Sequence, residues 1–195
     1  MNKEEIINII CEKYAFLNDE CKLEFSKYSK VLVLEKGEIL VKEGQYSDKA
    51  YFIVKGCSRA FYLNNGKDIT DWFAFENDFI CAINSFFQNI PSPHFIEVLE
   101  ETTLLVISRD YIMKLSDKYH DFERLTNRVA TRTMLKLQAR IVAMQFQSAE
   151  QKYQNILSAY PTITQRVSLT HIASYIGITL ETLSRIRKQH IKNLI

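Results

Sequence analysis

Glycine and proline are scarce in this sequence of 195 residues, with five and three copies. This scarcity excludes long flexible or proline-rich linkers. No stretch approaches the roughly 18 apolar residues of a membrane span. No apolar segment follows the polar start at Met1–Glu5, as a secretory signal would require. We therefore expect a cytoplasmic protein without a membrane partner.

Cysteine clusters and catalytic motifs are also missing. Cys11, Cys21, Cys57 and Cys81 are dispersed, so we expect reduced, buried thiols rather than ligands of an iron–sulfur cluster. There is no G-x-S-x-G motif and no P-loop. A cupin-like enzyme would need several histidines as metal ligands, and only His94 lies in the strand-rich part of the chain. We predict a protein that is not an enzyme and has no metal or other cofactor.

The remaining composition is that of a folded protein, with 47% hydrophobic and 25% charged residues. Its charge is unevenly distributed. Residues 162–195 hold five cations and one anion, a net charge of +4, which leaves −2 for the rest of the chain. A basic tail indicates a polyanionic partner at one end of the molecule; a solvated basic surface is the alternative. The cations are Arg166, Arg185, Arg187, Lys188 and Lys192, and the anion is Glu181.

Short strands dominate the first 110 residues, after two expected helices at 3–13 and 19–29. The strand candidates are rich in β-branched and aromatic residues, and turn signals separate them. Asn65-Gly66 is the strongest of these signals and predicts a hairpin. Many short strands at regular spacing predict a β-roll of the jelly-roll type. The candidates span 31–34, 39–41, 51–55, 58–63, 69–75, 95–99 and 103–107.

The composition of residues 111–151 predicts a helical stretch, because the segment contains no glycine or proline and is rich in good helix formers. An apolar stripe at spacings near four, with further apolar residues on a second side, predicts a helix of about 25 residues that packs against two partners. One partner is its own domain, and the other is a second copy of the chain. Two packing faces within one chain are the alternative. The expected dimer stripe is Leu125, Val129, Leu137, Ile141 and Met144.

The segment 168–187 carries the clearest signal. Ser168 is suited to cap a first helix, and Gly177 can end it with a positive φ. Thr179 can then cap a second helix. An extended segment over 160–167 should precede them, because a helix should stop before Tyr160-Pro161. This is the pattern of a helix-turn-helix, with an unrelated helical hairpin as the alternative. The expected buried positions are Ile172, Ala173, Ile176, Leu183 and Ile186.

The outward face of the second helix is suited to DNA. Arg185 can bond O6 and N7 of guanine, and Glu181 can accept from N4 of cytosine. Hydroxyl groups and further cations are suited to phosphates. An exposed helix face with a Glu–Arg pair is the alternative. The predicted contact residues are Thr179, Leu180, Glu181, Thr182, Ser184, Arg185, Arg187, Lys188 and Gln189.

Together these segments resemble the Crp/Fnr family of bacterial transcription regulators. The resemblance is carried by 172–179 and 181–186, and by 36–44 with 51–56, which are similar to the entry of a cyclic-nucleotide-binding β-roll. It implies an α+β fold with a sensor β-roll at 1–118, a dimerisation helix at 119–147 and a helix-turn-helix domain at 148–195 with a short or absent wing. It also implies a homodimer on palindromic double-stranded DNA, with RNA polymerase as a candidate partner.

The sequence departs from the family at the effector site. Members that bind cyclic AMP carry a Gly-Glu-Leu start and an Arg-Ser/Thr pair, but no arginine or lysine lies between Glu76 and Pro93 here. A buried cyclic phosphate without a cation would be unstable, so we expect no cyclic AMP binding and an effector of unknown identity. Leu180 also replaces an arginine that is common in the family, so the preferred DNA sequence should differ. Candidate pocket residues, with simple β-roll core as the alternative, are Phe73, Phe75, Phe79, Ser85, Phe86, Phe87 and Ser92.

A different function class stays open at this point. The β-roll could be a small-molecule-binding module whose C-terminal helical hairpin contacts proteins. The basic tail favours DNA as the partner.

Overall fold

Two short helices begin the chain, as predicted. The computed structural model describes the backbone of residues 1–192 and the side chains of residues 1–189. Helix α1 spans Lys3–Lys13 and helix α2 spans Asp19–Tyr28. Each begins after an asparagine whose side chain accepts a hydrogen bond from the first turn: Asn2 from Glu5 N–H and Asn18 from Cys21 N–H. The helices therefore start where their caps lie.

Within the described residues, eight strands form two four-stranded antiparallel sheets, with orders β1-β8-β3-β6 and β2-β7-β4-β5. The two sheets enclose an apolar core that includes Ile53, Ile96 and Leu104, which confirms the predicted β-roll. All seven predicted strands are present. The strands are β1 (Lys30–Leu34), β2 (Ile39–Val41), β3 (Lys49–Lys55), β4 (Ser58–Asn64), β5 (Lys67–Ala74), β6 (Phe79–Cys81), β7 (Phe95–Val98) and β8 (Thr102–Ser108).

The β4–β5 hairpin turns at Asn65-Gly66, where φ is 51° and 75°. Two positive φ values in a two-residue loop match the twist of paired strands, so the hairpin prediction is confirmed. Strand β6 and the adjoining helix α3 (Ile83–Gln88) were not predicted. All three residues of β6 are apolar, so the segment shows no alternating pattern.

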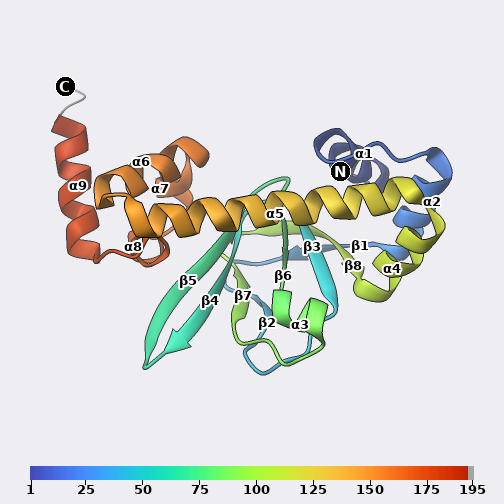
Figure 1. The fold of residues 1–195 in the computed structure, drawn as a ribbon, viewed down its shortest axis with the longest axis horizontal. Coiled ribbons are helices and arrows are strands. Elements are labelled where there is room, and N and C mark those ends of the chain that lie inside the picture. Colours follow the sequence, from blue (N-terminus) through green and yellow to red (C-terminus); the bar gives the residue numbers. More distant parts are fainter. Residues whose placement is uncertain (193–195) are drawn as a thin grey trace.

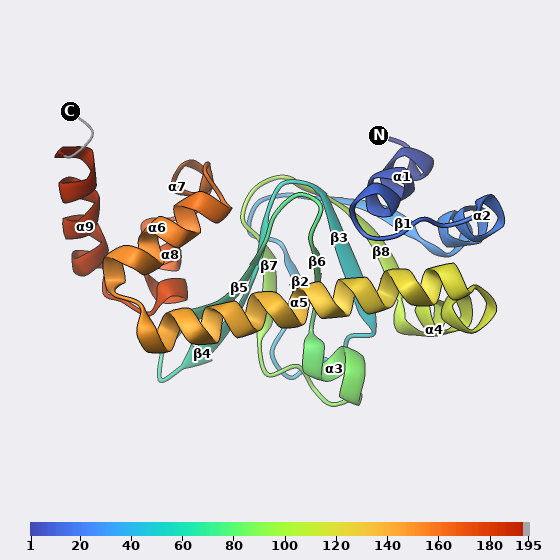
Figure 2. The same ribbon diagram turned by 45° about the horizontal axis from the view of Figure 1, so that its top comes forward.

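A helix of 27 residues, α5 (His120–Phe146), runs the length of the molecule (Figures 1 and 2). The length of α5 is close to the predicted 25 residues, and two breaks separate it from the other helices of the helical stretch predicted over 111–151. The backbone is extended at Tyr119, which separates α5 from α4 (Arg109–Lys118). A second break at Gln147 precedes Ser148, whose side chain caps α6 (Ala149–Ala159). No helix within residues 1–192 combines the length and apolar character needed to cross a membrane.

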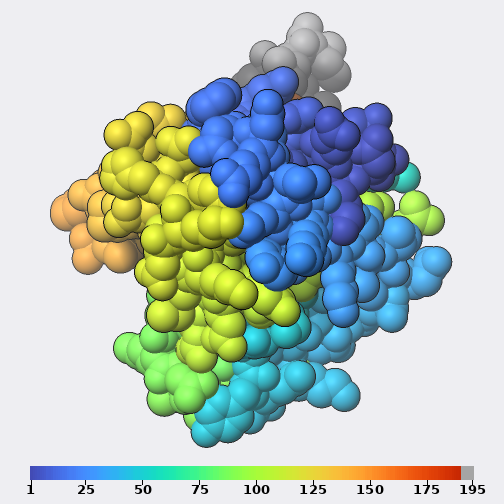
Figure 3. Space-filling model, turned by 90° about the vertical axis from the view of Figure 1, so that its right-hand side faces the viewer, coloured from blue at the N-terminus to red at the C-terminus, as the bar shows by residue number. Residues whose placement is uncertain are grey.

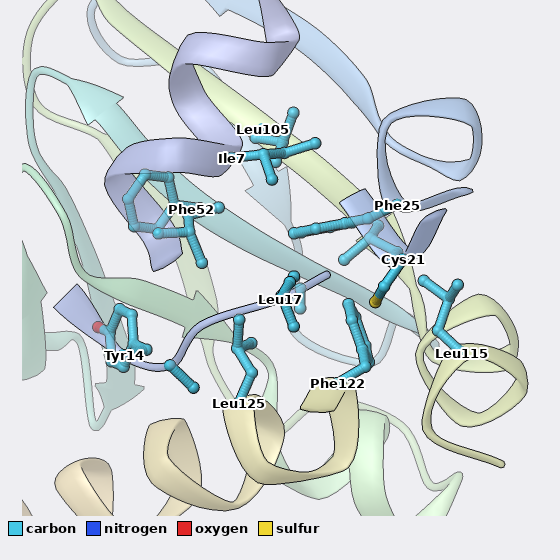
Figure 4. Packing of buried hydrophobic residues seen from close by; sticks show 14 of the residues in the cluster. Ile7, Tyr14, Leu17, Cys21, Phe25, Phe52, Leu105, Leu115, Phe122 and Leu125 are labelled. Atoms are coloured by element: carbon cyan, nitrogen blue, oxygen red, sulfur yellow. The ribbon is translucent and has the colours of Figure 1, made fainter. Parts of the chain in front are cut away.

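One core joins the N-terminal helices to the start of α5. Phe25 and Phe122 meet edge to face with ring centroids 5.2 Å apart, and both are buried (Figure 4). Leu17 and Leu125 fill the space between the N-terminal segment and α5. Figure 3 views this end of the molecule, where α1, α2 and α4 form one continuous surface.

The C-terminal helices gather at the opposite end of α5 (Figures 1 and 2). They are α6, α7 (Ile163–Arg166), α8 (Leu169–Ile176) and α9 (Leu180–Lys192). Helix α6 ends before Tyr160, as predicted. The extended segment predicted over 160–167 is wrong, because a short helix forms after Pro161 and buries Ile163.

Candidate nucleic-acid interface

Helices α8 and α9 form a capped helix–turn–helix unit. Ser168 Oγ accepts from His171 N–H at 3.2 Å, and Thr179 Oγ1 accepts from Thr182 N–H at 3.2 Å. Gly177 has φ +70°, and Ile178 N–H donates to the carbonyl of Ala173 at 3.0 Å, which closes the turn. The predicted caps and glycine turn are confirmed.

The five predicted core positions of this unit are all buried. They share one apolar cluster with Tyr153 and Ile156 of α6 and Ile163 of α7. A Cβ at Gly177 would lie 2.5 Å from Cε of Met144 on α5, so the turn also packs closely against the long helix. The turn therefore needs glycine for its backbone angle, and a Cβ there would also displace the flexible end of Met144.

Helix α9 lies at the free end of the molecule (Figure 1). Of the predicted contact residues, six side chains are exposed: Thr179, Leu180, Glu181, Arg185, Lys188 and Gln189. Those of Thr182, Ser184 and Arg187 are half-buried. Leu180, Glu181, Ser184, Arg185 and Lys188 line one shallow depression, so the structure brings the central part of the predicted set together.

The carboxyl of Glu181 is held in its charged form. Hydrogen bonding with its own backbone N–H, and with the side chain of Thr179, lowers its pKa below the usual 4.5. At neutral pH this side chain can only accept hydrogen bonds. The face thus presents an acceptor at Glu181 and donors at Arg185 and Lys188.

One predicted cation of the basic tail does not contribute to this face. The Arg166 guanidinium bonds both oxygens of Glu76, at 2.6 and 2.9 Å, and its Nε donates to Glu100 at 3.0 Å. It also stacks on Phe75, 5.2 Å from the ring centroid. Arg166 is therefore a link between α7 and the β-roll. The side chain of Lys192, also counted in the tail, lies outside the described residues, as does the end of the chain where a wing was considered.

The helix-turn-helix unit packs against strand β5 of the roll. Thr70 N–H donates to Ser174 Oγ at 2.9 Å, and the rings of Phe73 and Tyr175 lie 5.0 Å apart. Arg140 of α5 pairs with Asp71 at 3.0 Å beside this contact. The orientation of α9 is therefore tied to the sheet that carries β5.

The seven candidate effector residues do not share a pocket. Phe73 and Phe75 pack against the C-terminal helices, whereas Phe86 belongs to the N-terminal core and Phe87 is 66% exposed. Phe79 packs on Tyr14, with ring centroids 5.5 Å apart.

The two candidate serines have local partners. Ser85 Oγ accepts from Ser47 N–H at 2.7 Å, and Ser92 Oγ donates to the carbonyl of His94 at 2.7 Å. His94 itself is buried, and burial lowers its pKa below 6.5. The alternative of simple β-roll packing therefore describes this set better than a common site.

The predicted dimer stripe is only partly accessible. Leu125 is 2% exposed and lies in the internal core, so it is not accessible to a second chain, whereas Val129 packs against the same core and is half-buried. Leu137 is half-buried, whereas Ile141 and Met144 are exposed. The exposed apolar residues of α5 are Met134, Leu135, Ile141, Val142, Met144 and Phe146. Met134 was not predicted, although its spacing of seven to Ile141 was a usable signal.

The cysteines behave as core residues. Cys21 and Cys57 are fully buried, and burial raises the pKa of each to about 12; Cys11 and Cys81 are half-buried. In the part of the chain that the structure describes, no three His, Cys, Asp or Glu side chains are grouped as metal ligands.

Comparisons with known proteins agree with this architecture. Residues 31–119 match the family model of the cyclic nucleotide-binding domain. No curated protein sequence matches the chain. FixK2 from Bradyrhizobium japonicum superimposes with a TM-score of 0.72 at 18% identity, over 85% of this chain and 86% of that one. CLP from Xanthomonas campestris, a c-di-GMP responsive global regulator, has a TM-score of 0.69 at 12% identity, over 90% and 93%.

A protein from Eubacterium rectale assigned to the Crp/Fnr family extends the comparison. Its TM-score is 0.68 at 18% identity, and the match covers 90% of this chain and 85% of that one. The chain thus carries a cyclic nucleotide-binding type of β-roll. Its overall fold is that of the Crp/Fnr regulators, as the sequence resemblance predicted.

Proposed function

We propose that this chain is a sequence-specific DNA-binding transcription regulator that acts as a homodimer. The capped unit of α8, Gly177 and α9 carries the proposal, because its second helix exposes Glu181, Arg185 and Lys188 at the free end of the molecule. An α-helix fits the major groove, and the first residues of such a helix reach the base edges. The fold shared with FixK2 and CLP supports the same role.

In this proposal the side chains at the start and along the outer face of α9 contact different parts of the DNA. Arg185 donates to guanine and Glu181 accepts from cytosine. Thr179, Thr182, Arg187 and Lys188 contact phosphates. Leu180 is 40% exposed and can touch a thymine methyl but cannot donate to guanine. The preferred site therefore differs from one that is read by an arginine at that position.

A second copy of the chain supplies the symmetry. Met134 and Ile141, like Leu135 and Val142, lie seven residues apart and are exposed on α5, which is the spacing of a coiled-coil seam. Two parallel α5 helices would place two α9 helices on half-sites about 34 Å apart. The chain then divides into a sensor roll at 1–118, a dimerisation helix at 119–147 and a DNA-binding domain from 148 onward, in the cytoplasm. RNA polymerase is a candidate partner.

The roll does not bind cyclic AMP in this proposal. The segment that would face a cyclic phosphate has no lysine or arginine between Glu76 and Pro93, and its two serines bond within the chain. Calorimetry with cyclic AMP should show no binding; micromolar affinity would overturn this part of the proposal.

The DNA-binding test compares two single-charge variants. Sites are first selected from random double-stranded DNA, and affinity for the best site is then measured by fluorescence anisotropy. Arg185→Ala should weaken binding about 10- to 100-fold, from ~1–3 kcal/mol per bidentate contact, and relax the base preference at one position of each half-site. Arg124→Ala is the matched control, because Arg124 is exposed on α5 at the end remote from α9.

Two outcomes would count against the proposal. Equal affinity and base preference for the two variants would remove Arg185 as a reading residue. Failure to select any sequence would favour the alternative of a small-molecule-binding module, in which the C-terminal hairpin contacts a protein.

The dimer is tested separately by sedimentation velocity. The double variant Met134→Asp with Ile141→Asp should be monomeric, and a monomeric wild type would refute the proposed seam.

A further inference from the structure

A cavity of about 160 Å³ lies where the end of α1, strands β5 and β6, and the middle of α5 meet. Three aromatic rings form its walls, those of Tyr14, Trp72 and Phe79. None of these positions belongs to the proposed DNA interface. An engineered cavity of ~150 Å³ in another protein holds one benzene molecule, so this space is sufficient for a single six-membered ring.

The charges around the cavity do not balance. Asp78 is buried, and its Oδ1 pairs with Lys13 at 3.2 Å and with Lys136 at 2.8 Å. Arg132 adds a third cation, with its guanidinium 5.2 Å from the centre of the Tyr14 ring. Three cations thus face one carboxylate, which leaves the lining with a net charge of +2.

We propose that this cavity binds a small aromatic carboxylate. The ring of the ligand would pack between Tyr14 and Trp72, and its carboxylate would accept from Arg132 and Lys136, which lie one turn apart on α5. Aromatic rings favour edge or offset contact with other rings, and a guanidinium binds a carboxylate through two parallel hydrogen bonds. A neutral ring would make no charge-assisted hydrogen bond with Arg132 or Lys136, and an aliphatic acid would make no contact between rings.

Such a ligand would connect two segments that are far apart in the sequence. Lys13 and Tyr14 lie at the end of α1. The ring of Tyr14 contacts Phe79 of β6 and Arg132 of α5, and all of these residues line the cavity. Lys13 Nζ and Tyr14 Oη both donate to the carbonyl of Asn77, at 2.6 and 3.0 Å. Leu135 lines this cavity and also belongs to the apolar face of α5 that is proposed for the dimer, so the cavity lies beside that seam and is tested without DNA.

Trp72 is the single tryptophan of the chain, so its fluorescence reports on this cavity directly. The probe is benzoate, with benzyl alcohol as the neutral ring and acetate as the anion without a ring. We expect a saturable fluorescence change for benzoate with a Kd of about 0.1–1 mM, in the range open to so small a ligand. The two comparison compounds should bind at least tenfold more weakly.

Variants then locate the binding. Arg132→Gln should weaken benzoate binding about tenfold or more, because it removes a charge-assisted hydrogen bond. Arg124→Gln removes the same charge two turns earlier on α5 and should leave benzoate binding unchanged. Both residues are exposed, so both variants should keep the wild-type circular dichroism spectrum.

The proposal is overturned if wild-type protein shows neither a saturable fluorescence change nor calorimetric heat with benzoate. It is equally overturned if benzyl alcohol binds as well as benzoate, or if Arg132→Gln and Arg124→Gln bind benzoate alike. None of these readouts uses DNA, so their failure leaves the proposed regulator function untouched, and failure of DNA selection leaves the cavity proposal untouched.

Discussion

Replacing Arg166 should loosen the contact between the C-terminal helices and the β-roll. Its side chain is 21% exposed and bonds two carboxylates, Glu76 and Glu100, which are about one-third exposed. A hydrogen bond to a charged group contributes ~1.5–3 kcal/mol when buried, and solvent screening reduces this for partners so exposed. Arg166→Ala also leaves two carboxylates beside each other without a cation. We expect a loss of about 2–3 kcal/mol in the free energy of unfolding.

The pH dependence of this loss follows from Glu76. Burial alone would raise the pKa of its carboxyl, but hydrogen bonds from Arg166 and from backbone N–H groups outweigh burial and hold the pKa below 4.5. A carboxyl with a lowered pKa stabilises the fold above its unfolded value and loses that stabilisation as the pH falls through its folded value. The difference between wild type and Arg166→Ala should therefore be full at pH 7 and shrink below pH 4.5.

Urea unfolding followed by circular dichroism measures this prediction. The midpoint should fall for Arg166→Ala at pH 7 with an unchanged slope, whereas Arg124→Ala should match wild type. If Arg166→Ala unfolds with wild type at pH 7, or if the difference persists undiminished at pH 3, the ion cluster does not hold this contact.

Three further predictions follow. Gly177→Ala should lower the free energy of unfolding by about 1–2 kcal/mol, because φ is positive at this position. The loss should exceed that of Gly37→Ala, since only the Cβ at position 177 meets the flexible end of Met144. Equal urea midpoints for the two variants would contradict this. The native thiols of Cys21 and Cys57 should resist a disulfide reagent at pH 8 until denaturant is added, since burial raises each pKa to about 12; rapid native labelling of either would refute their burial. Burial lowers the pKa of His94, so the free energy of unfolding of the wild type should fall as the pH drops below 6.5. His94→Leu should reduce this dependence on pH between pH 7 and 5. An unchanged dependence would show that His94 does not cause it.

Much of the fold could be read from local patterns. The caps at Ser168 and Thr179, the Asn65-Gly66 hairpin and the turn at Gly177 each depend on backbone angles that neighbouring residues set, and each was predicted from sequence. The core of the helix-turn-helix unit could also be predicted from sequence, because a period of 3.6 residues places Ile172 and Ile176 on one face. The exposed positions of α9 followed from the same period.

Other features depend on contacts between distant segments. Arg166 is a basic residue in a basic tail, and only its ion pairs with Glu76 and Glu100 of the roll remove it from the free positive charge of the C-terminal helices. Apolar residues of α5 look alike in sequence, yet Leu125 lies in the internal core while Met134 is exposed, because the N-terminal helices cover only the first part of α5. The aromatic cluster expected to be one pocket is likewise divided between two cores.

The sequence by itself therefore determined the helix-turn-helix at Gly177, the β-roll and the residues that α9 exposes, because short-range periodicity and capping chemistry decide these. The tertiary structure alone decided which cations stay free, which face of α5 remains open and where a charged aromatic cavity forms. These depend on side chains such as Lys13, Asp78 and Arg132 that are far apart along the chain and are brought together only by packing.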